Sequence, residues 1–99
     1  MKRRTVGYAP AAAADLEWIY DTIAEASDLS IASRYEERIR SFCDNLAHAA
    51  ERGTLRDDLR PGLRVVGYAR RITVAFVVGE ERVTILRLFY GGRNWEDDF

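Results

Sequence analysis

The end of the sequence gathers residue types that bind anions and protein surfaces. Residues 88–99 read LFYGGRNWEDDF, so a strongly apolar run stops at two glycines before an arginine and a tryptophan follow. Glycines let a backbone turn or be approached closely, and Arg, Trp and Tyr are the residue types most enriched at the energetic centres of interfaces. The pattern predicts a binding element made of Arg87, Tyr90, Gly91, Arg93 and Trp95.

The same residues also fit a purely structural role. Trp95 can fold back to seal the open end of a small domain, since a buried indole supplies much of the packing energy there. Arg93 can pair with Glu96 or Asp97. Arg87 alternates with apolar residues on an expected strand, so it faces solvent, a partner or a salt bridge. The sequence leaves both interpretations open.

Cleavage of a phosphodiester is a second chemistry to consider. It needs cations aimed at the developing charge and a group that takes a proton from a 2′-hydroxyl. The sequence offers few groups that could take this proton. The one histidine, His48, lies outside the apolar stripe of its expected helix, which indicates a position on the helix surface. We therefore expect no catalytic residue. The candidates for the nuclease alternative are Arg64, Arg70, Arg87 and Arg93 as cations and Tyr90 as proton carrier.

Composition narrows the other function classes. One histidine and one cysteine, Cys43, offer no ligand spacing for a metal, and Gly91-Gly92 lacks the Gly-Lys-Ser/Thr pattern of a phosphate loop. We expect no metal, no cofactor and no small-molecule substrate. The formal net charge of −1 argues against nucleic-acid binding by this chain alone, because that affinity comes mainly from neutralised phosphates.

Length and cysteine usage indicate one intracellular domain. A chain of 99 residues with 47% hydrophobic and 31% charged residues has ordinary globular composition, with one domain over residues 1–99. A single cysteine forms no internal disulfide, which fits a reducing compartment. No apolar run approaches the roughly 20 residues that cross a bilayer, and no apolar signal segment follows the charged start. We expect a cytoplasmic protein without a membrane partner.

The first half of the chain predicts a strand and two helices. Residues 4–9 form an edge strand that stops at Pro10, a residue suited to the first turn of a helix. Apolar residues at spacings of three and four then mark one helix face: Leu16, Ile19, Tyr20 and Ile23. A break at 26–28 starts the second helix, expected to run to about Arg52, with Gly53 ending it. Its stripe comprises Ile31, Tyr35, Ile39, Phe42, Leu46 and Ala49.

The second half predicts three strands. A polar connection over 53–62 leads into runs at 63–68, 70–78 and 82–90, and a tight hairpin connection joins the last two. The run 70–78 alternates in a way typical of a strand with one solvated face, whereas 82–90 is apolar on both faces and central. The predicted fold is α+β with the order β-α-α-β-β-β, in which an antiparallel helix hairpin packs on one face of a mainly antiparallel sheet.

This order and several local motifs resemble one family. The motifs are Pro-x-Ala-x-x-Asp-Leu at 10–16, Gly-Leu-Arg at 62–64, RITVAF at 71–76 and, most specifically, VTILRLFYGGRNW at 83–95. Together they are similar to the RelE/ParE toxins of type II toxin–antitoxin pairs over nearly the whole chain. The ParE-like branch is the favoured one.

The resemblance implies two target classes. ParE-like toxins bind and poison DNA gyrase and are not known as nucleases, whereas RelE-like toxins are ribosome-dependent endoribonucleases that cut mRNA. The weak provision for proton transfer favours the gyrase-binding class, with Arg87, Tyr90, Gly91, Arg93 and Trp95 as target-binding candidates. A third possibility is an inactive module whose only act is to bind its antitoxin.

The resemblance also implies a partner, a small ParD-like antitoxin with a DNA-binding amino-terminal part and a flexible arm that wraps the toxin. Such an arm needs an exposed apolar surface on the toxin. We expect this apolar surface in the groove beside the helix pair, near Trp18, Tyr20 and Tyr35. Trp18 lies about a quarter turn off the buried stripe on the helical wheel, as a boundary or exposed residue. Operator DNA would then be bound only through the antitoxin complex.

Overall fold

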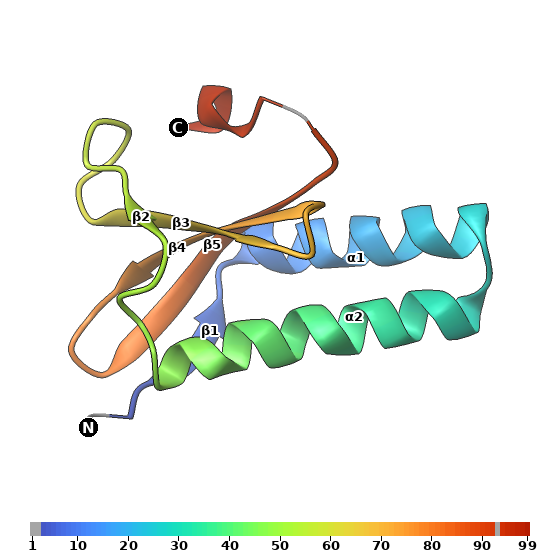
Figure 1. Ribbon diagram of the computed structural model, residues 1–99, viewed down its shortest axis with the longest axis horizontal. Coiled ribbons are helices and arrows are strands. Elements are labelled where there is room, and N and C mark those ends of the chain that lie inside the picture. The colour runs from blue at the N-terminus through green and yellow to red at the C-terminus, as the bar shows by residue number, and fades with distance from the viewer. Residues whose placement is uncertain (1–2, 93) are drawn as a thin grey trace.

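The computed structural model of the chain describes residues 3–92 and 94–99 and places two helices on one face of a five-stranded sheet (Figure 1). In chain order the elements are β1 (Thr5–Tyr8), α1 (Pro10–Ala26), α2 (Leu29–Asp44), the 3-10 turn η1 (Asn45–Ala47), β2 (Thr54–Leu55), β3 (Leu63–Tyr68), β4 (Ile72–Val78), β5 (Arg82–Tyr90) and the 3-10 turn η2 (Trp95–Asp98). The strand order is β1-β5-β4-β3-β2, with β1 parallel to β5 and the other pairs antiparallel. The predicted α+β fold is confirmed.

Side-chain caps fix the connection between the helices. Helix α1 begins at Pro10, as predicted, because a residue without a backbone N–H fits the first turn, where that donor has no partner. At its end, the Ser27 N–H and hydroxyl both donate to the Ile23 carbonyl oxygen, at 2.9 and 2.7 Å. Asp28 then starts α2 by accepting the Ile31 N–H at 2.9 Å. The break predicted at 26–28 is therefore a tight turn between two helices.

The second helix is shorter than predicted. It does not run to Arg52, because the chain tightens into η1 directly after α2. The Arg4 N–H donates to the Ala47 carbonyl oxygen at 3.1 Å, which ties η1 to the start of β1. This turn directs the chain back toward the sheet, whereas a continued straight helix would carry it away.

The strand boundaries also differ from the predicted ones. The connection over 53–62 contains β2, a two-residue strand that pairs with β3. Gly53 ends no helix. Its φ is +74°, and a Cβ there would overlap the Val65 carbonyl oxygen, so glycine is required where the connection meets β3. Strand β4 begins later than predicted, because Ala69 and Arg70, with φ of 53° and 64°, form the turn before it.

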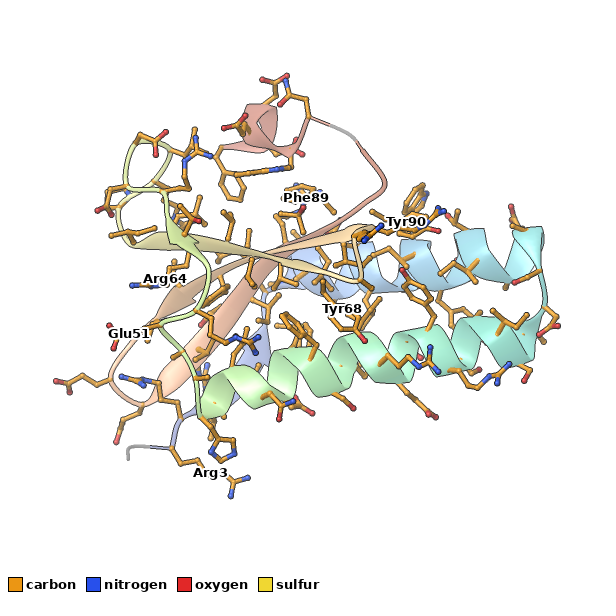
Figure 2. The ribbon with its side chains drawn as sticks, in the orientation of Figure 1. Arg3, Glu51, Arg64, Tyr68, Phe89 and Tyr90 are labelled. Atoms are coloured by element: carbon orange, nitrogen blue, oxygen red, sulfur yellow. The ribbon has the colours of Figure 1, made fainter. Side chains whose placement is uncertain are left out.

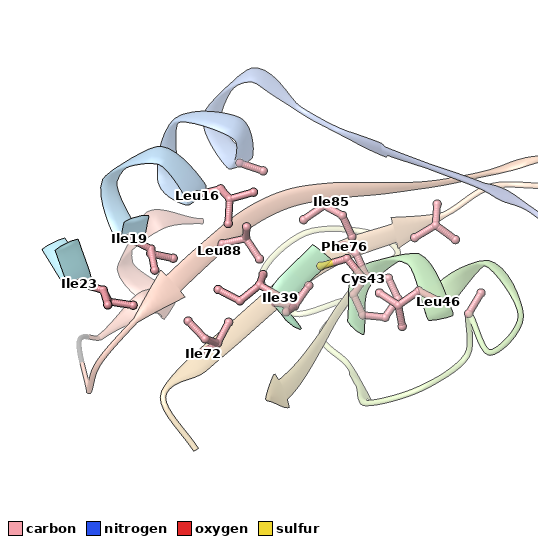
Figure 3. Packing of buried hydrophobic residues seen from close by; sticks show 14 of the residues in the cluster. Leu16, Ile19, Ile23, Ile39, Cys43, Leu46, Ile72, Phe76, Ile85 and Leu88 are labelled. Atoms are coloured by element: carbon pink, nitrogen blue, oxygen red, sulfur yellow. The ribbon is translucent and has the colours of Figure 1, made fainter. Parts of the chain in front are cut away.

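The main core lies between the helices and the sheet (Figure 3). Helix α1 contributes its predicted stripe, and α2 contributes Ala32, Ile39 and Cys43, whereas Ile31 and Ala49 of the predicted stripe are exposed. The sheet contributes six buried side chains from β4 and β5: Ile72, Val74, Phe76, Val83, Ile85 and Leu88. Burial of this apolar surface is the main stabilising term for a domain of this size.

A second, smaller apolar cluster covers the opposite face of the sheet. Leu63, Ala75 and Phe89 are buried there, and Trp95 and Phe99 from the end of the chain pack against them. Figure 1 shows this C-terminal segment, in red, on the side of the sheet away from the helices. The prediction of a solvated face on β4 is therefore wrong at Ala75, because the chain folds back over it.

A β-bulge in β5 decides which side chains face the helices. The pairing of β4 with β5 shifts at Leu86, which is the extra residue. As a result, Ile85 and Leu88 both face the main core although they are three positions apart. Alternation then resumes, so that Phe89 faces the C-terminal segment and Tyr90 faces the helices (Figure 2).

A carboxylate from α1 completes the open edge of β5. Strand β1 pairs with β5 only as far as Ile85. Beyond that point Asp15 accepts the Leu88 N–H at 2.9 Å and two hydrogen bonds from Arg87, 2.7 Å from Nε and 3.0 Å from Nη2. These bonds raise the pKa of the Arg87 guanidinium. Only 25% of the Arg87 side chain and 16% of the Asp15 side chain are exposed, so this ion pair is part of the fold.

Replacement of Asp15 tests this role. Asp15→Ala leaves the Arg87 guanidinium and the Leu88 N–H without their acceptor, so the free energy of unfolding should fall by about 2 kcal/mol. Asp15→Asn should cost about 1 kcal/mol, because an amide oxygen still accepts the Leu88 N–H. Glu17→Ala, at an exposed position of the same helix, is the control and should change stability by less than about 0.5 kcal/mol. Urea unfolding followed by circular dichroism measures all three, and an unchanged Asp15→Ala stability would contradict the assignment.

The buried thiol gives a second prediction. Burial raises the pKa of Cys43 to about 11 from 9.0, which lowers its thiolate fraction at pH 8 about a hundredfold. Iodoacetamide should therefore label Cys43 in the native protein only as fast as the fold opens and exposes the thiol. In urea, the labelling rate should rise to that of a cysteine in an unfolded chain. Because the folded thiol keeps a proton that the unfolded thiol loses, stability should also decline as pH rises above about 9. Fast labelling without urea would show that Cys43 is accessible.

Candidate functional site

Three aromatic residues predicted for two different partners meet at one place. Tyr90, at the end of β5, has its ring centroid 6.4 Å from that of Trp18 and 6.2 Å from that of Tyr35, both in edge-to-face geometry. Trp18 is 57% exposed, and the two tyrosines are partly buried. The target-binding candidate Tyr90 and the antitoxin-binding candidates Trp18 and Tyr35 thus form a single aromatic cluster.

A cation lies beside this cluster. The Tyr35 hydroxyl is buried and has no hydrogen-bond partner in the described part of the chain. Burial is the main cause of its raised pKa, with Tyr90 adding to it, whereas the positive charge of Arg71 acts in the opposite direction. Arg71 is itself exposed, at the start of β4, so the cluster presents aromatic faces and positive charge together.

The β3–β4 turn brings a second arginine to the same end of the sheet. Ile72 pairs with Tyr90, and the Gly91 N–H donates to the Arg71 carbonyl oxygen at 2.8 Å, so the turn and the end of β5 are neighbours. The turn residues Ala69 and Arg70 both have left-handed φ values, which cost about 1 kcal/mol each for residues with a Cβ. We call this region the turn end and define it by its six exposed or partly exposed residues: Trp18, Arg70, Arg71, Tyr90, Gly91 and Gly92.

The two glycines of the turn end differ in what the fold requires. Gly91 has φ of +83°, a conformation that side chains with a Cβ rarely adopt. Gly92 has no such φ, and a Cβ built on it meets nothing within 4 Å. The fold therefore explains Gly91 but not Gly92. Arg93, the next target-binding candidate, lies outside the described residues.

The tryptophan of the ending seals the domain. The Trp95 ring stacks on Phe89 at 6.2 Å and an interplanar angle of 28°, and it contacts Phe99 edge-on at 6.4 Å. The Arg56 guanidinium lies 5.4 Å from the Trp95 ring centroid and binds Glu96 at 2.7 Å. Of the two interpretations of Trp95, the structure has the one in which it folds back over the sheet.

The candidates for the nuclease alternative are dispersed. Arg87 faces the side of the sheet opposite to Tyr90, and its guanidinium is bound to Asp15 and 4.9 Å from the Phe89 ring centroid. Arg64 lies near the start of β3, far from Tyr90 in Figure 2, and donates to the Arg52 carbonyl oxygen at 3.3 Å. Among the cations of the set that the structure describes, Arg70 is the one in the turn beside the end of β5, where Tyr90 lies. The predicted cations and proton carrier therefore share no common pocket in the described part of the chain.

Tyr20 belongs to a different surface from Trp18 and Tyr35. Its hydroxyl lies 3.5 Å from Ser33 Oγ. It lines a groove of about 300 Å³ between the two helices, together with five other residues: Ala13, Leu16, Glu17, Glu36 and Arg40. The three antitoxin-binding candidates are thus divided between the aromatic cluster and this helix groove.

Sequence reasoning missed a larger groove between α2 and β3. It has a volume of about 480 Å³ and is lined by Arg34, Glu37, Arg38, Ser41, Phe42, Asn45 and Tyr68. The Phe42 and Tyr68 rings are 4.6 Å apart and form its floor, and Arg52 lies 5.2 Å from the Phe42 ring centroid. The arginines at positions 34 and 38 share one helix face, but only the folded chain shows that β3 lies opposite them.

The described residues, 3–92 and 94–99, contain neither a metal site nor a membrane-spanning helix. Within that range no cluster of His, Cys, Asp and Glu has the arrangement of a metal site. Over the same residues, no helix is long and apolar enough to span a bilayer.

Comparison with known proteins identifies the family. The family model described as the ParE toxin of the type II toxin–antitoxin system parDE matches residues 6–95. The chain is 32% identical to Toxin ParE3 of Caulobacter vibrioides over 80 residues, which cover 81% of this chain and 79% of that protein. It is also similar to a solved chain of the chromosomal ParDE system from P. aeruginosa, with a TM-score of 0.78 and 25% identity, covering 91% of this chain and 98% of that one. These matches confirm the ParE-like branch over the RelE-like one, and the chain therefore belongs to the ParE toxin family of type II toxin–antitoxin systems.

Proposed function

We propose that this toxin arrests growth by binding and poisoning DNA gyrase in the cytoplasm, and that it does so as a binding protein and not as an enzyme. The observation that carries the proposal is that Tyr90 lies in an exposed surface of aromatic rings and arginines, whereas Arg87 lies on the opposite face of the sheet. Cleavage of RNA needs a cation and a proton carrier within reach of one phosphate. Among the cation candidates, Arg87 is bound to Asp15 and Arg64 donates to the Arg52 carbonyl oxygen. Tyr90 packs against Trp18 and Tyr35, so its surroundings resemble a protein-binding surface more than a site for proton transfer.

The turn end is the surface that we assign to the target. It combines an exposed tryptophan, a tyrosine and two arginines, the residue types that dominate binding energy at protein interfaces. Trp18 and Tyr90 are held in fixed geometry by the helix pair and by β5, so little side-chain freedom is lost on binding. Trp95 does not belong to this surface, because it packs on Phe89 at the other face of the sheet.

A ParD-like antitoxin is the proposed partner that neutralises the toxin, as the ParDE system from P. aeruginosa supports. An extended arm needs long grooves, and the helix groove and the groove between α2 and β3 provide them. Arg34, Arg38 and Arg52 around the second groove favour an arm that carries carboxylates beside apolar residues. Operator DNA would be bound by the antitoxin part of the complex.

The target is tested with purified components. Wild-type toxin should inhibit DNA supercoiling by gyrase and should trap gyrase-cleaved DNA, and induction in cells should trigger the DNA-damage response early. Addition of toxin to translating ribosomes should leave the mRNA intact, because the described residues assemble no proton-transfer site. Codon-biased cleavage of mRNA in that assay would support the RelE-like alternative. Normal growth after induction would indicate an inactive module that binds only an antitoxin.

Gly92 offers a test of close approach by the target. Gly92→Ala should leave the melting temperature within about 1 °C of wild type, because the added Cβ meets open space. If the gyrase backbone packs against this glycine, the same change should weaken inhibition about tenfold. Gly79→Ala, in the β4–β5 connection at the opposite end of the sheet, serves as a control for inhibition once each variant's stability is known. Full inhibition by Gly92→Ala would remove Gly92 from the interface.

A further inference from the structure

We propose that the strained β3–β4 turn and the aromatic cluster beside it form one preorganised surface that binds a segment of the target carrying carboxylates next to an apolar side chain. The inference rests on the proposed function in one respect, because it takes the occupant to be the protein that the toxin inhibits. It assigns a binding role to Arg70, Arg71 and Trp18 together.

The turn is the first step of the argument. Three residues, 69–71, connect the paired residues Tyr68 and Ile72, and two of them have a positive φ, which Asn and Gly tolerate better than other residues do. Here the two positions are Ala69 and Arg70. The ladder on either side is regular, from Leu63 opposite Val77 to Tyr68 opposite Ile72, so the fold itself gains nothing from an arginine at this place. Strain of this kind persists mainly where function requires the residue that carries it.

Charge is the second step. Arg70 and Arg71 are exposed, and neither forms an ion pair with another described residue. Arg56 and Arg87 are held by carboxylates of the chain itself. Other arginines, such as Arg34 and Arg60, also have no ion pair with a described residue, but at the turn end two such groups are adjacent. The fold thus leaves two neighbouring guanidinium groups without a carboxylate at the turn end, and these suit a partner that supplies one.

The aromatic cluster supplies the apolar part of the contact. Trp18 is 57% exposed although its ring edge is held against Tyr90. A rigid, exposed indole of this type acts as an anchor at protein interfaces. Gly91 and Gly92 follow Tyr90 in the chain and carry no side chain, and a Cβ on either would meet nothing within 4 Å. The backbone of a partner can therefore approach Trp18 and the two arginines from one direction.

Shape favours a folded target over the antitoxin arm as the occupant. The turn end is a compact surface fixed by β4, β5 and α1. The two grooves described above lie between the helices and between α2 and β3, and a groove fits an extended arm better than the turn end does. Rigid surfaces lose little entropy on binding an equally rigid partner.

The experiment replaces Ala69-Arg70 by Asn-Gly and measures stability and inhibition on the same protein. The double variant Ala69→Asn/Arg70→Gly should melt about 3 °C or more above wild type, because the strain is relieved. Its inhibition of gyrase supercoiling should fall about tenfold or more. Arg71→Glu and Trp18→Ala should also weaken inhibition. In the Arg71→Glu variant, the inhibition of gyrase should depend less on salt concentration than in wild type. Arg60→Glu, an exposed arginine in the loop before β3, is the matched control and should inhibit like wild type.

The outcomes separate this inference from the proposed function. If wild-type toxin inhibits gyrase and the Asn-Gly variant inhibits equally well, this inference is overturned while gyrase remains the target. If wild-type toxin does not inhibit gyrase, the proposed function fails, and growth arrest on induction becomes the readout, which the Asn-Gly variant should still relieve. Equal arrest by both proteins, or loss of antitoxin binding with inhibition retained, would overturn the inference. A lower melting temperature of the variant would contradict the claim of strain.

Discussion

The contact of Asp15 with β5 is the constraint on which the second half of the structure depends. Strand β1 is too short to cover the whole edge of β5, so α1 supplies a carboxylate where a neighbouring strand would supply a carbonyl group. By accepting from the Leu88 N–H and from Arg87 at once, Asp15 fixes α1 against the sheet and stabilises β5 just after its bulge. A charge-assisted, bidentate geometry makes this contact directional as well as strong.

That contact also determines which residues are available for function. With Arg87 held by Asp15, the face of the sheet near it closes under Trp95 and Phe99, and the one-residue shift of the bulge turns Tyr90 toward the helices. The same β5 therefore contributes to a sealed face and to an exposed end. A toxin that cuts RNA would need these side chains on one face, and one that binds a protein does not.

The sequence predicted the helices and strands better than it predicted the contacts and roles of their side chains. Periodicity placed both helices and three strands, because amphipathic patterns follow directly from burial. It could not show that Arg87 meets Asp15, 72 positions away, since a long-range ion pair leaves no local spacing. The early end of α2 depends on the contact of η1 with Arg4, again a tertiary effect. The sequence left open whether Trp95 seals the domain or binds a partner, and only the folded chain places Phe89 beneath it.

Several features that the fold does not compensate coincide at the turn end of the structure. Arg56 and Arg87 have carboxylate partners, and the apolar residues of both clusters have neighbours. At the turn end, by contrast, the backbone is strained at Ala69 and Arg70, and Trp18 is exposed. Selection for stability alone would remove each of these features by a single substitution. Their coincidence within one small region is therefore better explained by a partner that compensates all of them when it binds.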